Sequence, residues 1–534
     1  MAEKMRRRAF ALAPLLAAGL AACAGGRAGP AAPESPGART ACATILSTND
    51  THGQLLPRTF RGSGDALVGG SAALAAWLDR AREASDCPAF LLSGGDVMQG
   101  TAISNLERGA STIEAFNALG YDAAALGNHE FDWGLDVLKE RLAQARFPFL
   151  AANVFEKATG RRPGWIEPYA ILERGGVRVG VIGLATASTP ATTKPWIVAD
   201  LEFRPISETL RAVVPEVRAR GVDFVVALMH AGGFCRPDEG CSGEAFDALA
   251  GGGSGVDYAV TGHTHSFLRT RVGEIPVAQS RSSTAAFGVE RLERLADGTV
   301  RADLPSIRVP WADSVVPDPG VAAIVDGYRA RVAEISDRPL GIALARPLNR
   351  TRGGPTGYAL GRLIADAQRS VAGTEVALMN NGGIRRNLPA GPLTYGDLLA
   401  LQPFENVLVR LRLRGDRLLA ALEHALESGS PDAHVGGLTV EYDPFAPAGG
   451  RVRTVTLADG RPLDRAAAYS VVVNDFMAGG GSGFTMLQEA DSAEVTGIVD
   501  LDALIEYLRS LPQPVAAPDD VRWRHATPAE AEGE

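Results

Sequence analysis

Short apolar runs in the first part of the chain end, one after another, in clusters of histidine, aspartate and asparagine. The runs lie at residues 44–47, 90–92, 123–126, 147–151, 177–184, 224–229 and 258–260. The stretches between them, such as 134–145 with leucines at helical spacing, predict helices, so we expect an α/β layered domain. Polar clusters follow five runs: Asn49-Asp50-Thr51-His52, Gly95-Asp96, Gly127-Asn128-His129-Glu130, His230 and Gly262-His263-Thr264-His265. Because α/β sheets bind ligands beyond the carboxyl ends of their strands, the clusters predict one shared site.

The clusters supply the donor atoms of a site for two metal ions. Five of the eight histidines lie in them. The mixture of imidazole nitrogen with carboxylate or amide oxygen suits zinc, manganese or iron better than calcium. Two ions about 3.5–4 Å apart need one shared ligand and further ligands of their own. Asp50, His52, Asp96 and His265 could bind the first ion, and Asp96, Asn128, His230 and His263 the second, with Asp96 bridging.

Each of these residues alone has an ordinary structural explanation. An aspartate after a strand is usually a turn or capping residue, and a single histidine is more often a packed side chain than a ligand. The recurrence of such residues at successive strand ends favours a metal centre.

His129 and Asp132 form a separate pair. They are three residues apart, so the Asp132 carboxylate can accept a hydrogen bond from the His129 ring. Such a carboxylate fixes the tautomer of an imidazole and raises its pKa, as a general acid requires. The alternative is that Asp132 caps the helix expected at 134–145, and the two roles are compatible.

The ordered clusters resemble the five sequence blocks of the calcineurin-like metallophosphoesterases. The longer forms Asn49-Asp50-Thr51-His52-Gly53 and Gly127-Asn128-His129-Glu130-Phe131-Asp132 are similar to the 5′-nucleotidase / UDP-sugar hydrolase branch. The resemblance implies an α/β protein with a four-layer αββα N-terminal domain and a smaller α/β C-terminal substrate-binding domain, joined by a helical connector. It also implies two divalent metal ions, with His129 and Asp132 as a catalytic dyad outside the metal ligands.

The chain divides at Pro317-Asp318-Pro319, which precedes one helical stretch at 321–335. We expect the phosphoesterase domain at 42–316, a helical linker at 317–339, the C-terminal domain at 340–526 and a loose tail at 527–534. Strand-like runs in the C-terminal domain lie at 376–379, 407–413, 438–442 and 469–473.

The C-terminal region carries residues in the places of the branch's substrate-binding blocks. By resemblance, Asn380 and Arg385 bind phosphate or ribose oxygens, as a Gly-rich loop followed by an arginine fork can. Phe404 and Phe484 match the two rings that sandwich a nucleobase. A plain turn and core packing are the alternatives for these residues.

The same region departs from the branch in two places. Ser482 stands where the branch usually has aspartate. The arginine and glutamate that usually precede the block at 360–366 are absent at the expected spacing, where Arg350 or Arg352 could substitute. Both departures concern nucleotide preference and leave the metal residues untouched.

The first 22 residues are typical of an export signal, because basic residues precede an apolar run at 9–22. That run is shorter than the roughly 20 residues of a membrane-spanning helix. Leu20-Ala21-Ala22-Cys23 resembles a bacterial lipobox, which implies a lipid on Cys23 and a flexible tether at 23–41. Ordinary secretion, with Cys23 incidental, is the alternative.

The four remaining cysteines predict two disulfides, because exported proteins meet an oxidising compartment. Four cysteines allow three pairings. Cys42 and Cys87 begin two runs that we expect to form neighbouring strands, whereas Cys235 and Cys241 are six residues apart in one loop. We therefore favour the pairs Cys42–Cys87 and Cys235–Cys241.

Together these features predict an exported hydrolase, lipid-anchored to a bacterial membrane and facing the periplasm or the cell exterior. By resemblance it hydrolyses nucleoside 5′-phosphates with a metal-bridging hydroxide, for nucleotide scavenging. The alternatives use the same site for 2′,3′-cyclic nucleotides, UDP-sugars or a thiosulfate ester, or bind a nucleotide without turnover. The formal net charge of −9 disfavours a nucleic-acid partner, and we expect a monomer that contacts the membrane only through its lipid.

Overall fold

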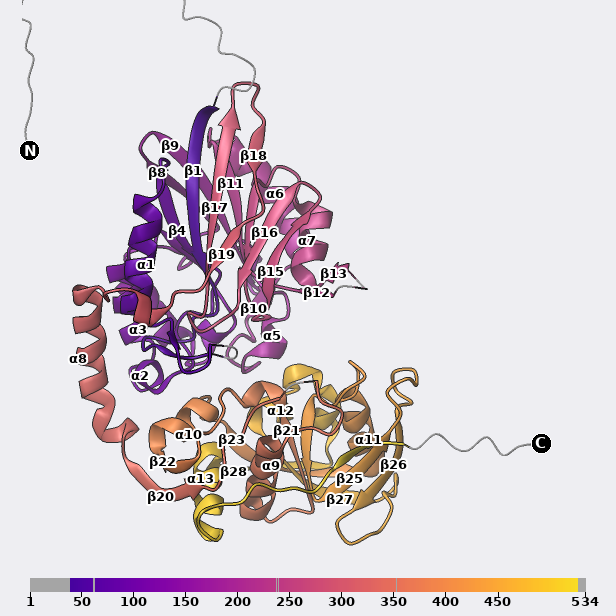
Figure 1. The fold of residues 1–534 in the computed structure, drawn as a ribbon. Coiled ribbons are helices and arrows are strands. Elements are labelled where there is room, and N and C mark those ends of the chain that lie inside the picture. Colours follow the sequence, from indigo (N-terminus) through magenta and orange to yellow (C-terminus); the bar gives the residue numbers. More distant parts are fainter. Residues whose placement is uncertain (1–38, 61–62, 237, 239, 352, 527–534) are drawn as a thin grey trace, which may run out of the picture.

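Two regions of the chain fold around separate cores and meet along one side (Figure 1). The computed structural model describes residues 39–526 except 61–62, 237, 239 and 352. The predicted export signal, Cys23, most of the tether, Arg352 and the tail at 527–534 lie outside the described residues.

Two stacked sheets form the centre of the N-terminal domain. In the first sheet, β1, β4, β5 and β6 are parallel and β17 pairs antiparallel with β1. Its strands are β1 (Arg39–Thr48), β4 (Ala89–Ser93), β5 (Ala123–Ala125), β6 (Phe149–Leu150), β17 (Phe287–Leu295), β18 (Val300–Ala302) and β19 (Ser306–Arg308). In the second sheet, β9, β11, β14 and β16 are parallel, with β8 and β15 antiparallel at its edges. Its strands are β8 (Tyr169–Arg174), β9 (Val177–Ala185), β11 (Phe224–His230), β14 (Tyr258–Thr261), β15 (Phe267–Val272) and β16 (Ile275–Ser280).

Helices cover the outer faces of both sheets, which gives the four-layer αββα arrangement that the family resemblance implies. Side chains such as Ile45, Phe90 and Val226 fill the space between the sheets and are at most 1% exposed. Helices α1 (Ser71–Glu83), α3 (Ala110–Leu119) and α4 (Leu135–Gln144) contribute to the core outside the first sheet, and α6 (Ile206–Arg218) and α7 (Glu244–Gly252) to the core outside the second. Each helix buries one apolar stripe, as period-3.6 spacing requires.

The expected linker is the helix α8 (Pro319–Ser336), which begins at an Asp318 side-chain cap. Val321, Val325, Tyr328 and Val332 on this helix pack into the core of the N-terminal domain, beside α1 and α3. The helix therefore belongs to the first domain through most of its length. The chain passes to the second domain only where α8 ends, before β20 (Pro339–Leu344) (Figure 1).

A five-stranded sheet in the order β24-β21-β27-β23-β28 is the centre of the C-terminal domain. Its strands are β21 (Val376–Asn380), β23 (Val407–Arg414), β24 (Ala433–Gly436), β27 (Ala468–Asn474) and β28 (Ser492–Val499). Helices α9 (Ala359–Ala372), α10 (Tyr395–Leu401) and α13 (Asp500–Ser510) share one core with this sheet. On its other side lie α11 (Gly415–His424) and a small sheet of β25 (Leu438–Tyr442), β26 (Val452–Leu457) and β29 (Trp523–His525). The smaller elements include β22 (Gly391–Thr394), which pairs with β20, and α12 (Asp475–Ala478).

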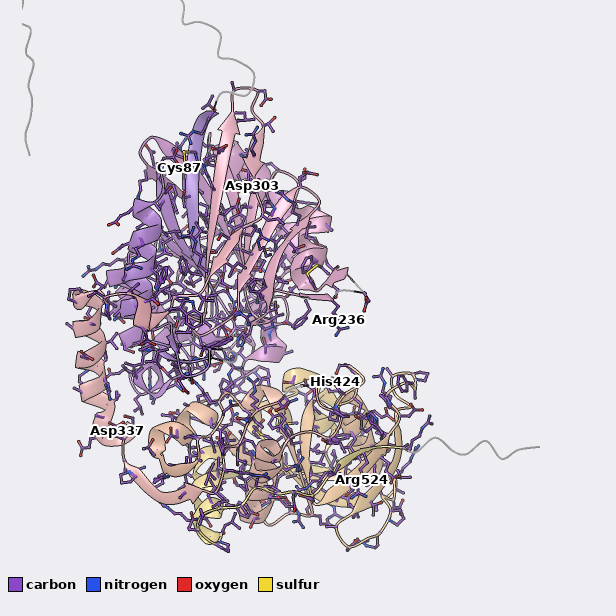
Figure 2. All side chains as sticks on the ribbon, in the orientation of Figure 1. Cys87, Arg236, Asp303, Asp337, His424 and Arg524 are labelled. Carbon is purple, nitrogen blue, oxygen red and sulfur yellow. A yellow bond between two sulfur atoms is a disulfide. The ribbon has the colours of Figure 1, made fainter. Side chains whose placement is uncertain are left out.

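Two disulfides join the cysteine pairs that the sequence favours. Cys42 on β1 is bonded to Cys87, just before β4, with the two Cα atoms 5.5 Å apart. Cys235 and Cys241 are bonded across the hairpin of β12 (Phe234–Arg236) and β13 (Gly240–Ser242). Figure 2 shows Cys87 at the end of the first sheet that is remote from the C-terminal domain. None of the helices in the described part of the chain combines the length and apolar character needed to span a membrane.

The two disulfides should differ in how much they stabilise the fold, because their loops differ in length. Replacing Cys42 and Cys87 by serine opens a 45-residue separation and should lower the free energy of unfolding by about 4 kcal/mol. The same change at Cys235 and Cys241, six residues apart, should cost about 2 kcal/mol. Denaturant unfolding of the two double variants beside the unmodified protein measures both values, and a larger loss for the hairpin pair would contradict the expectation.

Candidate metal centre

The carboxyl ends of the parallel strands from both sheets converge on one point. Strands β1, β4 and β5 lead into the loops of Asp50, Asp96 and Asn128. Strand β11 ends at His230, and β14 leads into the loop that holds His263. The loops after β1 and β4 are joined directly, because the Asp50 amide donates to the Gly95 carbonyl at 2.9 Å and the His52 amide to the Asp96 carbonyl at 3.0 Å. Clusters far apart in the sequence therefore form one site, as predicted.

Asp50, His52 and His265 form the first group of candidate ligands. Their ligand atoms all lie within 4.8 Å of one another. The His265 Nε2 is 3.4 Å from an Asp50 oxygen, and the His52 and His265 Nε2 atoms are 2.9 Å apart. Asp50 and His52 are buried, and His265 is half-buried.

Asp96, His230 and His263 form the second group, again with ligand atoms within 4.8 Å of one another. Asp96 Oδ2 lies 3.1 Å from His230 Nε2. The Asn128 side-chain oxygen lies 3.1 Å from His230 Nε2 and 3.0 Å from His263 Nδ1, so it completes this group. Asp96 Oδ2 is also 3.9 Å from His52 Nε2 of the first group. The carboxylate of Asp96 thus stands between the two groups, where a bridging ligand would be needed.

The donor set fits two transition-metal ions. His52 Nδ1 lies 2.8 Å from the Gln99 carbonyl, and His230 Nδ1 lies 2.8 Å from the Gly94 carbonyl. Each carbonyl accepts the proton of that nitrogen, which leaves the Nε2 lone pair directed at the site. Nitrogen and oxygen donors in this mixture suit zinc, manganese or iron.

Five of the seven candidate ligands have backbone conformations that ordinary residues rarely adopt. The φ angles are 49° at Asp50, 48° at His52, 51° at Asp96, 72° at His263 and 55° at His265. Left-handed conformations at residues other than glycine are uncommon and cost free energy. Such strain, concentrated at one cluster, indicates that the surrounding fold holds these side chains in place for a functional reason.

Glycines beside the ligands leave room for them. A Cβ atom on Gly127 would lie 2.3 Å from an Asp96 carboxylate oxygen, and one on Gly95 would lie 2.7 Å from His230 Nδ1. Gly95 also has a φ of 87°. The two glycines that precede Asn128 and Asp96 in the sequence motifs are therefore required by close packing at the site.

Glu130 is a part of the site to which the motif analysis assigned no role. Its side chain is buried and accepts hydrogen bonds from the backbone amides of Val97 at 2.7 Å, Gly127 at 2.8 Å and Asp96 at 3.0 Å. Burial and the nearby charge of Asp96 raise the pKa of Glu130 to about 7. Through these hydrogen bonds, the carboxyl group joins the loop after β4 to the loop after β5. The sequence feature that could have pointed to Glu130 is its position directly after His129 in the motif.

His129 and Asp132 lie together as predicted, with His129 Nδ1 2.7 Å from Asp132 Oδ2. The second Asp132 oxygen accepts a hydrogen bond from the Thr193 hydroxyl at 2.9 Å. Burial disfavours a charged ring, but the carboxylates of Asp132 and Asp96 outweigh it and raise the pKa of His129. The alternative role of Asp132 as a helix cap is not observed, because α4 begins after Gly134 without a side-chain cap. The geometry is that of an imidazole held ready to give up a proton.

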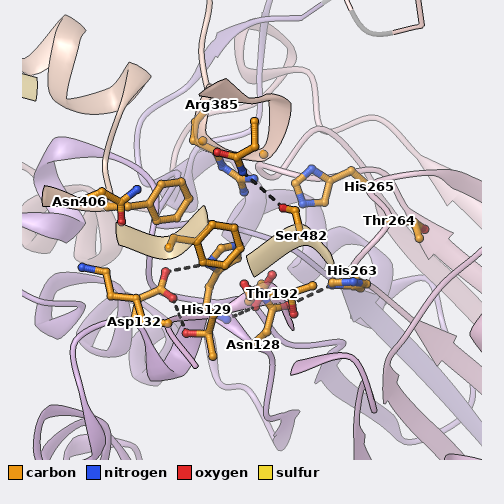
Figure 3. A pocket seen from close by; sticks show the side chains of 18 of the residues that line it. Asn128, His129, Asp132, Thr192, His263, Thr264, His265, Arg385, Asn406 and Ser482 are labelled. Carbon is orange, nitrogen blue, oxygen red and sulfur yellow. Dashed lines mark hydrogen bonds and ion pairs between the residues drawn. The ribbon is translucent and has the colours of Figure 1, made fainter. Parts of the chain in front are cut away.

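A cavity of about 360 Å³ lies between the two domains and reaches the second ligand group. The N-terminal domain lines it with Asn128, His129 and Asp132, and the C-terminal domain with Arg385, Asn406 and Ser482 (Figure 3). Asn380 and Phe404, the substrate-binding candidates from the resemblance, also line it. The Phe404 ring stacks on the His129 ring at 5.4 Å between centroids. Arg385 extends from the second domain to the metal centre, with its Nη2 3.2 Å from His52 Nε2.

The prediction for Phe484 is wrong. Its side chain is 3% exposed and packs in the core of the C-terminal domain, with its ring 4.6 Å from the His424 ring. Phe476, at the start of α12, lines the cavity instead. Ser482 also lines it, with a left-handed φ of 54°. Arg350 lies outside this cavity and lines a neighbouring one with Arg385.

Comparison with known proteins gives matches over nearly the whole described chain. Residues 43–267 match the family model of the calcineurin-like phosphoesterases, and residues 332–489 match that of the 5′-nucleotidase C-terminal domain. The snake venom 5′-nucleotidase of Naja atra is 30% identical over 88% of this chain and 96% of its own length. Endonuclease YhcR of Bacillus subtilis strain 168 is 29% identical over 91% of this chain, which spans 41% of YhcR. The structure of the 5′-nucleotidase precursor from Thermus thermophilus superimposes with a TM-score of 0.79 at 32% identity, over 91% of this chain and 99% of that one.

Replacing Asp96 by asparagine should weaken both metal positions together, because its carboxylate stands between the two ligand groups. We expect the metal content per chain, measured by plasma mass spectrometry after dialysis, to fall to near zero for at least one ion. Asp326→Asn changes an exposed carboxylate on α8 and is the matched control, which should keep the full content. An Asp96→Asn variant that retains two ions would show that Asp96 does not bridge.

Proposed function

The chain belongs to the 5′-nucleotidase family of calcineurin-like metallophosphoesterases and is a hydrolase, and we propose that it converts nucleoside 5′-monophosphates to nucleoside and phosphate. The observation that carries this proposal is the interdomain cavity. One end of that cavity is formed by candidate metal ligands, and the other by aromatic and amide side chains of the C-terminal domain. A molecule with a phosphate at one end and a nucleobase at the other matches this division.

The residues of the cavity suggest how such a substrate is held. We assign the metal ligands to Asp50, His52, Asp96, Asn128, His230, His263 and His265. Two divalent ions bound there would neutralise charge on the phosphate and activate a water molecule for attack on phosphorus. Arg385 adds a fixed positive charge beside the first ligand group, where its planar fork can bind phosphate oxygens. Asn380 and Asn406 offer amide groups to the ribose or the base.

His129 is the proposed proton donor to the leaving oxygen. It lines the cavity, contacts Asp132 through Nδ1, and has a raised pKa that keeps the ring protonated to a higher pH than an ordinary histidine. A protonated ring so placed can donate from Nε2 to a ribose oxygen as the phosphorus–oxygen bond breaks. An intact ligand set together with this donor supports turnover over simple nucleotide binding.

We also propose that the protein is exported and carries a lipid on Cys23. The N-terminal sequence supports this, and so do two disulfides, which persist in oxidising compartments. In that setting the enzyme would release nucleosides from nucleotides outside the cytoplasm.

His129→Ala should separate acid catalysis from metal binding. Turnover of AMP should fall about 10²- to 10⁴-fold, the usual range for loss of a general acid, while the metal content stays near that of the unmodified enzyme. Nitrophenyl esters should lose less, because their leaving groups need little protonation. His525→Ala, on β29 in the other domain, is the control and should change neither quantity. Loss of metal from the His129 variant would instead make His129 a ligand.

Removing the rings of Phe404 and Phe476 should test whether the cavity reads a nucleobase. If each ring stacks on the base, the double alanine variant should lose about 2–6 kcal/mol of binding for AMP, seen as a higher KM. p-Nitrophenyl phosphate, which has no base, should be hydrolysed almost as before. Phe445→Ala removes a ring that is 95% exposed elsewhere and serves as the control.

Measuring UDP-glucose and a 2′,3′-cyclic nucleotide beside AMP tests the substrate assignment itself. We expect AMP to have the highest kcat/KM.

An equal loss on AMP and on the nitrophenyl ester in the double variant of Phe404 and Phe476 would mean that the two rings support the fold and do not bind the base.

A further inference from the structure

A second and larger cavity, of about 840 Å³, lies against the first ligand group. His52 and His265 form its wall toward the metal centre. Serine, threonine and asparagine side chains line other parts of it. Four arginines, from both domains, also line it: Arg58, Arg350, Arg385 and Arg386. His265 and Arg385 line both this cavity and the interdomain cavity of about 360 Å³, so the two cavities adjoin at the metal centre.

Arginines are the charged residues among those described as lining this cavity. No aspartate or glutamate occurs among the residues described as lining it. Burial and the neighbouring charges of Arg58 and Arg385 lower the pKa of Arg386 to about 10, and burial lowers the pKa of Arg58. The Arg58 Nε is buried and has no hydrogen-bond partner within the described chain. Positive groups this close together, without a carboxylate among them, favour an anion between them.

Both domains hold these arginines in place. Arg58 lies on β2 (Arg58–Thr59), which pairs with β3 (Leu67–Val68), and its guanidinium is 5.6 Å from the centre of the Phe60 ring. Arg386 donates a hydrogen bond to the Gln54 side chain of the N-terminal domain. It directly follows Arg385, which contacts His52. The guanidinium groups are therefore fixed beside the metal ligands and are not mobile surface charges.

We propose that this cavity is a second anion subsite, in which Arg58 and Arg386 bind a phosphoryl group next to the metal-bound phosphate. Guanidinium forks bind phosphoryl oxygens with charge-assisted, bidentate hydrogen bonds. The group has two possible sources: a second phosphoryl attached to the one on the metals, or free inorganic phosphate that has left them. This inference rests on the proposed function, because it takes the metal centre as the place of the first phosphate.

The test compares inorganic phosphate and pyrophosphate as inhibitors of p-nitrophenyl phosphate hydrolysis by the metal-loaded enzyme, at constant free metal. Pyrophosphate can place one phosphoryl on the metals and the other among the arginines, so it should inhibit about 10- to 100-fold more strongly than phosphate. In Arg58→Gln/Arg386→Gln this advantage should fall at least tenfold. If the cavity holds free phosphate instead, phosphate should inhibit the unmodified enzyme in a mixed pattern that becomes purely competitive in the variant.

Two controls make the outcome decisive. Arg308→Gln, an exposed arginine on β19, should behave as the unmodified enzyme and corrects for chelation of metal by pyrophosphate. Arg58→Lys/Arg386→Lys keeps the positive charge but not the bidentate fork, so its advantage should lie between those of the glutamine variant and the unmodified enzyme. If the lysine variant loses as much as the glutamine variant, the arginines act through packing and the proposal is wrong.

The proposal is equally wrong if the glutamine variant changes neither the ratio of inhibition constants nor the inhibition pattern. Failure of the proposed function would look different, as an unmodified enzyme that does not hydrolyse AMP, with or without hydrolysis of the nitrophenyl ester. In that case calorimetric titration of the same variants with pyrophosphate makes the same comparison, and unchanged affinity in the glutamine variant would overturn the subsite.

Discussion

The position of the Asp96 carboxylate, between His230 of one ligand group and His52 of the other, is the constraint on which the rest of the site depends. It lies 3.1 Å from the first ring and 3.9 Å from the second. To bring these side chains so close, the two sheets must stack with their parallel strands ending at the same place. The left-handed backbone at Asp96, the missing side chain at Gly127 and the buried Glu130 carboxyl group all serve that one placement. The carboxylate of one aspartate, whose backbone is strained, thus links the layered fold to its chemistry.

The interdomain cavity at the metal centre is lined by residues of both domains. Its loop with Phe404 is fixed against the N-terminal domain, because Asn105 donates to the Pro403 carbonyl at 3.0 Å. Lys194 and Asp475 form an ion pair across the same boundary at 3.7 Å. Within the C-terminal domain, the Asp500 amide donates to the Asn406 carbonyl at 2.8 Å and so holds the same loop. Contacts between the domains therefore set the distance between the metal centre and the aromatic side chains, and with it the length of a substrate that fits.

The sequence indicates which candidate metal ligands come together, because their positions follow largely from the strand topology. Parallel strands of one sheet end at a common edge, so the residues just after β1, β4 and β5 come together, and so do those at the ends of β11 and β14. The stacking of the two sheets then joins the two sets into one site. The pairing of Cys42 with Cys87 follows from the same rule, since β1 and β4 are neighbours. The seven ligand candidates and the dyad could thus be named before the fold was seen.

What the sequence does not predict depends on local packing. Phe476 and Phe484 are eight residues apart, and a turn with left-handed residues at Gly480, Ser482 and Gly483 decides which ring faces the cavity. The helix α8 looks like a connector in the sequence, but its apolar stripe is buried against the first domain. Glu130 gives no periodic signal, because its partners are backbone amides: that of Gly127 in its own loop and that of Val97 in the loop after β4, which is distant in the chain.

The central claim is that this fold holds two metal ions that share Asp96. Anomalous diffraction from crystals of the metal-loaded protein, recorded at the absorption edge of the bound metal, tests it most directly. The account predicts two peaks about 3.5–4 Å apart, one beside Asp50, His52 and His265, the other beside Asn128, His230 and His263, with an Asp96 oxygen between them. A single peak, or two peaks without Asp96 as a common ligand, would contradict it.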